Sequence, residues 1–178
     1  YHIYHQYDPF DAAHGGPVLW NHLTTKDFVT YENHGPVLFP DSDLDSSGAY
    51  SGSAFVRNGK IHYLYTGNVK HFDRDDYDYV LMGRDQIHMV AENPDELGEK
   101  RMAVGPVDYP DDIGTHVRDP KILEHDGIYY MVLGARTKDD RGCVLVYTSR
   151  NLEDWSYATR IELGEKFGFM WECPDLFE

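Results

Sequence analysis

The chain is short of cysteine and of long apolar runs. It holds only two cysteines, Cys143 and Cys173, which rules out a disulfide framework and modestly favours a reducing compartment. No apolar run approaches the roughly 20 residues that a membrane-spanning helix needs, and no signal peptide is visible. The sequence therefore predicts no membrane partner.

Basic residues are also scarce, with 16 Lys and Arg against 31 Asp and Glu and a net charge of −15. Such a surface repels a polyanion, so we expect no nucleic-acid partner. A neutral polar ligand such as a sugar is compatible with this charge, although the charge does not indicate one. The 178 residues suffice for one domain with a sizeable core.

Helical periodicity is missing as well, and the 14 tyrosines favour strands. Arg57-Asn58-Gly59-Lys60 and His125-Asp126-Gly127 each separate two strand-like segments, and Asn-Gly and Asp-Gly are strong hairpin signals. The turn at 24–28 is echoed at 148–152 (148 − 24 = 124), and more weakly at 91–97. The predicted strands cover residues 1–7, 18–23, 54–56, 61–66, 86–91, 121–123, 128–133 and 143–148.

These repeats, at about sixty residues, predict four-stranded units of the kind that build β-propeller blades. On this count the chain holds just under three blades of an all-β fold. A β-sandwich is the runner-up, because it also shows many short strands joined by turns.

An acid stands near a proline at two places. Asp119 directly precedes Pro120, and Glu172 lies close to Pro174, 54 residues further on (174 − 120 = 54). A residue before proline disfavours the helical region, so Asp119 is predicted to be extended. Proline cannot donate to a sheet ladder, so Pro120 belongs at a strand start or on an edge strand. The two acids are either presented to a common cavity or simply end ordinary strands.

The neighbours of these two acids lead to further expectations. Adjacent residues of a regular strand point to opposite faces, so Arg118 and Asp119 share a site only where the backbone is irregular. The apolar run that precedes Glu172, which includes Phe169 and Trp171, predicts apolar surroundings for that carboxyl group.

Metal sites are not predicted. Four of the ten histidines lie close together in the sequence: His2, His5, His14 and His22. Their spacing fits no compact ligand motif, so polar packing is the better interpretation. The segment 41–45 resembles the start of a calcium loop, but Ser46 replaces the glycine at its sixth position and Gly52 the glutamate at its twelfth.

Five blocks of residues follow one another along the whole chain. They are Tyr4-His5-Gln6-Tyr7 with Pro9-Phe10, Trp20-Asn21-His22 with Lys26-Asp27-Phe28, Pro40-Asp41 leading to Ser51-Gly52-Ser53-Ala54, Arg118-Asp119-Pro120, and Glu172-Cys173-Pro174. In this order and spacing the chain resembles glycoside hydrolase family 32, the invertase and sucrose-6-phosphate hydrolase family. One block alone would be a weak signal, whereas five in order are specific.

The resemblance implies a fold and an activity. The family fold is a five-bladed β-propeller followed by a C-terminal β-sandwich. Residues 1–178 would then be a partial catalytic propeller domain, about blades 1–3, truncated at both ends, with the sandwich downstream. The implied activity is retaining hydrolysis of β-D-fructofuranosides such as sucrose or sucrose 6-phosphate, without a cofactor or metal.

The resemblance also implies roles for single residues. Glu172 would be the general acid/base, with Cys173 beside it. Asp119 would stabilise the transition state by holding fructose hydroxyl groups. The implied substrate-binding residues are Gln6, Trp20, Ser51 and Arg118.

Two features depart from the family pattern. The family nucleophile is an Asp in a Trp-x-Asn-Asp-Pro-x-Gly block upstream of the first motif, and no such block occurs here. His14 stands where many members have Trp. The chain also starts inside a predicted strand and stops six residues after Glu172 (178 − 172 = 6). We therefore expect a fragment of a longer protein that is inactive by itself.

Several functions stay open within this resemblance. A cytoplasmic sucrose-6-phosphate hydrolase is the leading interpretation, and a secreted member is the alternative location. A levanase, inulinase or fructosyltransferase would share these motifs. A non-catalytic carbohydrate-binding propeller is the alternative from a different class.

Overall fold

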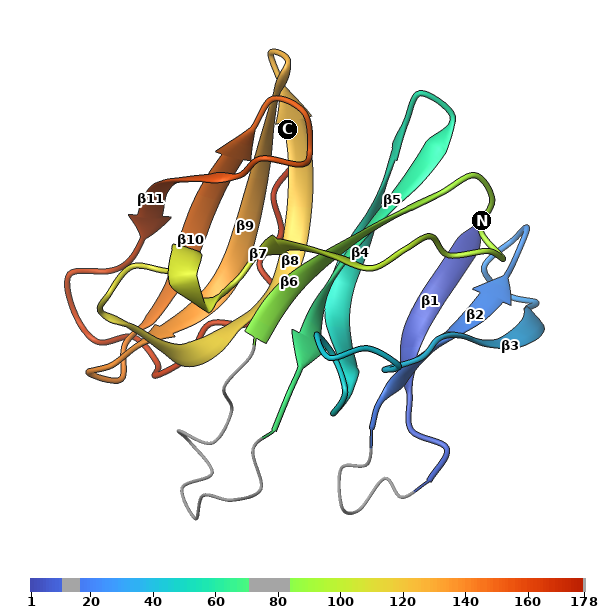
Figure 1. Ribbon diagram of the computed structural model, residues 1–178, viewed down its shortest axis with the longest axis horizontal. Helices are drawn as coiled ribbons and strands as arrows, with labels where there is room; N and C mark the ends of the chain where they lie inside the picture. The colour runs from blue at the N-terminus through green and yellow to red at the C-terminus, as the bar shows by residue number, and fades with distance from the viewer. Residues whose placement is uncertain (11–16, 71–83, 178) are drawn as a thin grey trace.

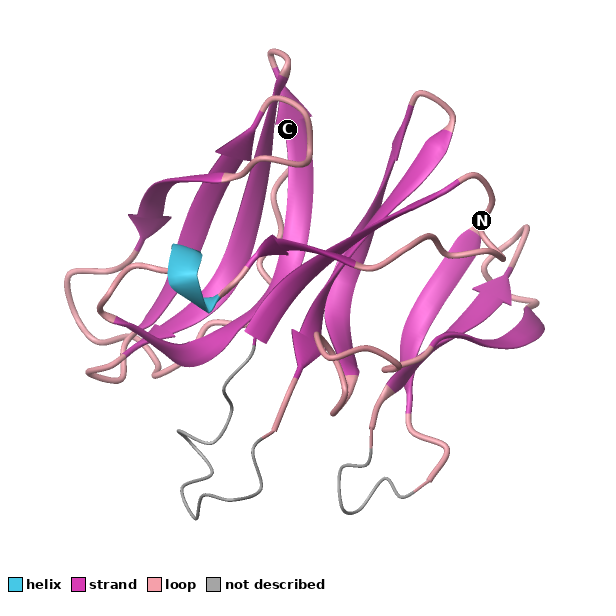
Figure 2. Ribbon diagram, viewed as in Figure 1, coloured by secondary structure: helices cyan, strands magenta, loops and turns pink. Residues whose placement is uncertain are grey.

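The computed structural model describes residues 1–10, 17–70 and 84–177 (Figure 1). Strands dominate this part of the chain, with a single turn of 3₁₀ helix at Pro106–Asp108 (Figure 2). His14 lies outside the described residues. None of the described residues belongs to a helix long and apolar enough to cross a membrane.

The strands form three antiparallel sheets, each made of consecutive strands. The first sheet contains β1 (His2–Tyr7), β2 (Leu19–Thr24) and β3 (Glu32–Leu38). The second contains β4 (Ala49–Arg57), β5 (Lys60–Asn68), β6 (Arg84–Ala91) and β7 (Arg101–Val104). The third contains β8 (Ile113–His125), β9 (Ile128–Thr137), β10 (Gly142–Ser149) and β11 (Ser156–Ile161).

The three sheets lie side by side, and β4 of the second packs against β8 of the third (Figure 1). A row of antiparallel meanders is the architecture of propeller blades, whereas a sandwich stacks two sheets face to face. The predicted all-β blades are therefore confirmed. Three strands were not predicted from the sequence: β3, β7 and β11. β7 has only four residues, and β3 and β11 are mostly exposed, without a clean alternation of buried and exposed positions.

Both predicted hairpins are confirmed. Asn58 and Gly59 join β4 to β5 with φ values of 52° and 76°, and Asp126 and Gly127 join β8 to β9 with 50° and 71°. Two successive residues at positive φ match the right-handed twist of the flanking strands, which is why Asn-Gly and Asp-Gly occur at such turns.

The repeated polar turns have the same hydrogen bonds. Thr25 Oγ1 accepts the backbone N–H of Phe28 at 2.9 Å, and Ser149 Oγ accepts that of Leu152 at 2.9 Å. Phe28 and Leu152 both adopt positive φ, 58° and 68°. One turn joins β2 to β3 and the other joins β10 to β11. Because these two turns are equivalent, β2 and β3 correspond to β10 and β11 of the third sheet. β1 then corresponds to β9 and, in the second sheet, to β5. β4 and β8 are therefore the first strands of their four-stranded blades.

Two pairs of histidines pack across neighbouring strands. His2 Nδ1 lies 2.9 Å from His22 Nε2 between β1 and β2, and His62 Nδ1 lies 2.9 Å from His88 Nε2 between β5 and β6. In each pair the two rings stack, with centroids 5.1 Å apart. Burial lowers the pKa of both His22 and His88, so these rings favour their neutral form.

Candidate active site

Most of the predicted site residues line one cleft of about 580 Å³. These residues are Gln6, Ser51, Arg118, Asp119 and Glu172. They come from the end of β1, the start of β4, the middle of β8 and the segment after β11. The structure thus brings together residues up to 166 positions apart (172 − 6 = 166).

Trp20 is the one predicted site residue that does not line this cleft. Its side chain is buried, and its indole N–H donates to the carbonyl oxygen of Tyr50 at 2.9 Å. Tyr50 in turn lines the cleft. Trp20 borders an adjoining cavity of about 440 Å³ that also reaches Gln6 and Ser51.

Asp119 reaches the cleft through a β-bulge. Between Arg118 and Lys121, β8 advances three residues while its partner β9 advances two, from Gly134 to Val132. Asp119 has a φ of 63°, so the prediction of an extended residue before Pro120 is wrong. The extra residue of a bulge needs an unusual backbone conformation, and Asp tolerates the left-handed region better than most residues.

The bulge also explains how neighbouring side chains share one site. Arg118 and Asp119 both line the cleft, as was expected only for an irregular backbone. A similar irregularity lies in β4, where Ala49 and Gly52 are three residues apart and pair with Gly67 and Tyr65, two apart. The predicted edge position of the Asp119 segment is confirmed, because β8 is the edge strand of its sheet.

The second sheet and the C-terminal segment hold Asp119 in place. Asp119 is buried, and its backbone N–H donates to Thr66 Oγ1 at 2.9 Å. Ser53 Oγ donates to the carbonyl oxygen of Pro120 at 2.7 Å. The backbone N–H of Cys173 donates to Asp119 Oδ2 at 2.8 Å. The last bond couples Asp119 directly to the residue that follows Glu172.

Glu172 lies in an irregular segment that the neighbouring Trp171 anchors to the third sheet. A Cβ atom at Gly134 would lie 2.2 Å from the carbonyl oxygen of Trp171, and one at Gly142 would lie 2.2 Å from its Cδ1. Both glycines are therefore required for this close approach. The Trp171 indole N–H donates to the carbonyl oxygen of Phe167 at 2.7 Å, which fixes the turn before Glu172.

The surroundings of Glu172 differ from the sequence prediction. Its side chain is 58% exposed, so the expected apolar enclosure is wrong. Glu172 Oε1 accepts a charged hydrogen bond from Arg118 Nη2 at 2.5 Å. Arg118 thus pairs with Glu172, and its Nη1 lies 3.2 Å from His116 Nδ1.

Cys173 contributes its backbone to the site. Burial, with the negative charges of Asp119 and Glu172, raises the pKa of its thiol, so the side chain stays neutral at ordinary pH. Its φ of 47° turns the chain between Glu172 and Pro174. Cys173 and Cys143 are both free thiols.

Seven further residues line the cleft, and of these the sequence pointed only to Phe169 and Cys173. They are Val18, Tyr50, Arg84, His116, Arg136, Phe169 and Cys173. The Arg84 guanidinium lies 4.7 Å from the centroid of the Tyr50 ring, and that of Arg136 lies 5.2 Å from the Phe169 ring. An arginine at a strand end carries no local sign of such a role, because only the assembly of sheets places it at the cleft.

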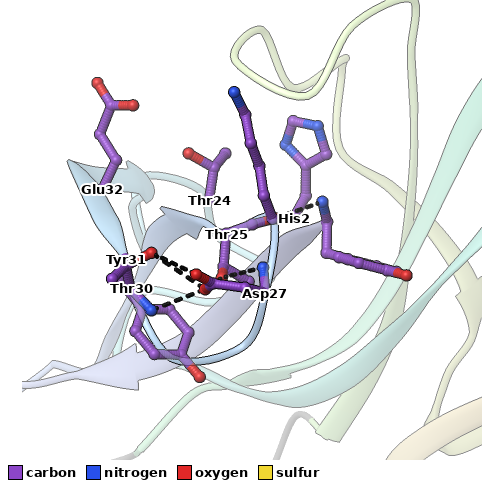
Figure 3. Close-up of a pocket in the computed structure, with 9 residues that line it drawn as sticks. His2, Thr24, Thr25, Asp27, Thr30, Tyr31 and Glu32 are labelled. Carbon is purple, nitrogen blue, oxygen red and sulfur yellow. Dashed lines mark hydrogen bonds between the residues drawn. The ribbon is translucent and has the colours of Figure 1, made fainter.

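A separate pocket of about 470 Å³ lies at the turn between β2 and β3 (Figure 3). Asp27 is one of its lining residues and accepts hydrogen bonds from the backbone N–H groups of Val29 and Thr30 and from the Thr30 hydroxyl. These bonds lower the pKa of Asp27 to about 2. They make Asp27 a turn-forming residue, and none of the predicted catalytic residues reaches this pocket.

The family follows from a comparison of the sequence with known families. The profile described as "Glycosyl hydrolases family 32 N-terminal domain" matches residues 1–178. The chain belongs to glycoside hydrolase family 32. The three sheets are accordingly blades of the five-bladed propeller of this family.

Its relatives include enzymes that act on sucrose-type sugars. The sucrose-6-phosphate hydrolase of Bacillus subtilis (strain 168) is 36% identical over 183 residues, covering 99% of this chain and 36% of that protein. The solved structure of sucrose-6-phosphate hydrolase from Lactobacillus gasseri has a TM-score of 0.85 at 35% identity, over 99% of this chain and 35% of that one.

A third relative was solved with a sugar bound. This mutant family 32 β-fructofuranosidase of Bombyx mori, in complex with sucrose, has a TM-score of 0.81 at 30% identity, over 99% of this chain and 36% of that one. The chain therefore spans about a third of the length of the relatives it matches.

Proposed function

We propose that the full-length protein is a retaining β-fructofuranosidase of the cytoplasm, with sucrose 6-phosphate as its main substrate. The observation that carries this proposal is the coupling of two carboxylates in one cleft. Asp119 accepts the Cys173 N–H, and the adjacent Glu172 reaches the cleft through its pair with Arg118. Likeness to sucrose-6-phosphate hydrolases supports the choice of substrate.

The proposed mechanism follows from what each group can do. A retaining glycosidase needs an acid that protonates the leaving oxygen and a nucleophile on the opposite face of the sugar. Glu172 is open to the cleft and can give its proton to that oxygen. Asp119 is buried and fixed, so its second oxygen is suited to accept hydroxyl groups of the fructose ring as positive charge develops.

The nucleophile is not among the two carboxylates that this chain contributes. In family members it is the Asp of the Trp-x-Asn-Asp-Pro-x-Gly block, which these 178 residues do not contain. Arg118 holds Glu172 and lies beside Asp119, and it can hold the acid in position while the leaving group departs. We propose a C-terminal β-sandwich as the further domain of the full-length protein.

The proposal is tested by assaying the purified full-length protein on sucrose, sucrose 6-phosphate, levan and inulin. We expect release of fructose from the two sucrose substrates, with the anomeric configuration retained at the first turnover in proton NMR spectra. Inversion would contradict the retaining mechanism. Binding of these sugars without any cleavage would favour the carbohydrate-binding alternative, and transfer of fructose to sugar in preference to water would favour a fructosyltransferase.

A further inference from the structure

We propose that Arg136, with His116 beside it, forms a subsite for the phosphate group of a phosphorylated leaving glucose. This inference rests on the proposed function, since it concerns the half of the substrate that Glu172 protonates. Arg136 lies near the end of β9. Arg136 and His116 together line both the active cleft and a small hollow that adjoins it.

The position of Arg136 relative to Asp119 and Glu172 indicates which part of a bound substrate Arg136 would meet. Asp119 is held from the second sheet, through Thr66. Arg136 lies on the other side, in the third sheet, where its guanidinium is 5.2 Å from the ring of Phe169 in the Glu172 segment. Phe169 lies three residues before Glu172 (172 − 169 = 3), and both line the cleft with Arg136. Arg136 therefore belongs to the Glu172 part of the cleft, and a leaving sugar protonated by Glu172 would come near it.

The guanidinium of Arg136 is held in one orientation. Its Nε and Nη2 both donate to Asp140 Oδ1, at 2.9 and 2.5 Å, and the Phe169 ring lies against its face. A planar fork that is fixed before the ligand arrives suits two-pronged recognition of phosphate oxygens, because little side-chain entropy is lost on binding. The aromatic ring beside it provides an apolar surface for the sugar.

The charge distribution gives a second reason. The chain carries a net charge of −15, which repels an anionic substrate. Three arginines nevertheless line the active cleft against two carboxylates: Arg84, Arg118 and Arg136 against Asp119 and Glu172. Arg118 pairs with Glu172, and Arg136 pairs with Asp140, which does not line this cleft. A neutral substrate such as sucrose needs no such concentration of cations.

The test compares two substrates that differ only in the phosphate. We would measure kcat/KM of the full-length protein for sucrose 6-phosphate and for sucrose, and use their ratio, because this ratio is insensitive to a loss of folded protein. Arg136→Gln should lower the ratio by about tenfold or more, the usual effect of losing a hydrogen bond to a charged group. Arg136→Lys should give a smaller decrease, since it keeps the charge without the fork.

Arg101→Gln is the matched control, because Arg101, at the start of β7, is exposed, pairs with Glu99 and does not line the cleft. It should leave the ratio unchanged. An unchanged ratio in Arg136→Gln would overturn the subsite. If that variant does not fold, Arg136→Lys decides in the same way, since a lysine can still pair with Asp140.

A second measurement identifies the half of the substrate that carries the phosphate. Glucose 6-phosphate should inhibit the hydrolysis of sucrose, and Arg136→Gln should weaken this inhibition by about tenfold, whereas inhibition by fructose 6-phosphate should change less. Equal weakening for both would overturn the assignment to the leaving group. A wild-type protein that cleaves neither substrate would instead contradict the proposed function, whereas cleavage of both with an unchanged ratio would contradict the subsite alone.

Discussion

Asp119 combines a buried carboxylate with a left-handed backbone, and both have the same cause. The bulge in β8 lets Asp119 and Arg118 face one cleft, which a regular strand would prevent. A positive φ at a non-glycine residue costs free energy of the order of 1 kcal/mol, which the surrounding structure must offset. The bonds from Cys173 and to Thr66 are the contacts that hold this conformation.

Asp119→Asn tests whether the charge of this residue serves catalysis or folding. We expect kcat and kcat/KM to fall together by about a hundredfold or more, because stabilisation of developing positive charge is lost. The melting temperature should change little, since the asparagine oxygen can still accept the Cys173 N–H. Steady-state kinetics and thermal unfolding of the full-length protein check both expectations.

Asp126→Asn is the control for Asp119→Asn. It removes the same charge at an exposed hairpin, where Asn-Gly is an equally favoured turn, so turnover and melting temperature should match the wild type. Near-normal turnover in Asp119→Asn would remove Asp119 from the active site. Loss of the folded state would give it a structural role instead.

At the level of elements, the second sheet supports the active-site strand of the third through buried side chains. Thr66 Oγ1 accepts the Asp119 N–H and donates to Gln86 Oε1 at 2.8 Å. Gln86 Nε2 in turn donates to the carbonyl oxygen of Val117 at 3.3 Å. The position of the bulge in β8 therefore depends on residues of β5 and β6.

Thr66→Val tests this support with little change of volume. It leaves the Asp119 N–H and Gln86 without their partner, and an unsatisfied buried polar group costs about 1–3 kcal/mol. We expect a comparable loss in the free energy of unfolding measured in urea, together with lower turnover. Thr66→Ser keeps the hydroxyl group and should restore most of both. Equal stability and turnover in the valine and serine variants would contradict a supporting role for the Thr66 hydroxyl group.

The His62–His88 pair makes the stability of the second sheet depend on pH. Burial, with the positive charges of His62 and Arg101, lowers the pKa of His88 from 6.5 to about 4. Because the folded pKa lies below the unfolded one, the stabilisation is complete above about pH 6.5 and is lost as the pH falls toward 4. The loss for this group is on the order of 3 kcal/mol.

This pH dependence can be measured by urea unfolding of the full-length protein between pH 7 and pH 4. His88→Gln should reduce the decrease in unfolding free energy over that range. His125→Gln, at an exposed hairpin turn, should keep the wild-type slope. An equally steep decrease in His88→Gln would show that other groups carry the acid sensitivity.

Local features of the fold could be read from the sequence, whereas contacts across the sheets could not. Asn58-Gly59 and Asp126-Gly127 identify their hairpins because the turn conformation depends on those residues alone. The bulge at Asp119 depends on how β8 pairs with β9, which no neighbouring residue specifies.

The same limit applies to the candidate site. The Arg118–Glu172 pair joins residues 54 positions apart, so the sequence suggested Asp119 as the neighbour of Arg118 instead. Gln6, Ser51 and Glu172 were found through ordered motifs of the family. Arg136 belongs to none of those motifs, and only the packing of the sheets places it at the cleft.

On the scale of the whole molecule, the cleft exists only because all three sheets and the C-terminal segment meet. Gln6 comes from the first sheet, Ser51 from the second and Asp119 from the third, and Glu172 completes the lining. The arrangement explains why the motifs are spread over the whole chain. Because Glu172 is the proposed acid, its role is the one that most needs a direct test.

The most direct test of this central claim is Glu172→Gln in the full-length protein, assayed on two substrates. Turnover of sucrose should fall by at least about a hundredfold, the usual lower scale for general acid catalysis. A fructoside whose leaving group needs no proton, such as a 4-nitrophenyl fructoside, should lose much less. Glu153→Gln, at the exposed turn after β10, should leave both rates unchanged. An equal loss on both substrates would contradict the assignment of Glu172 as the acid.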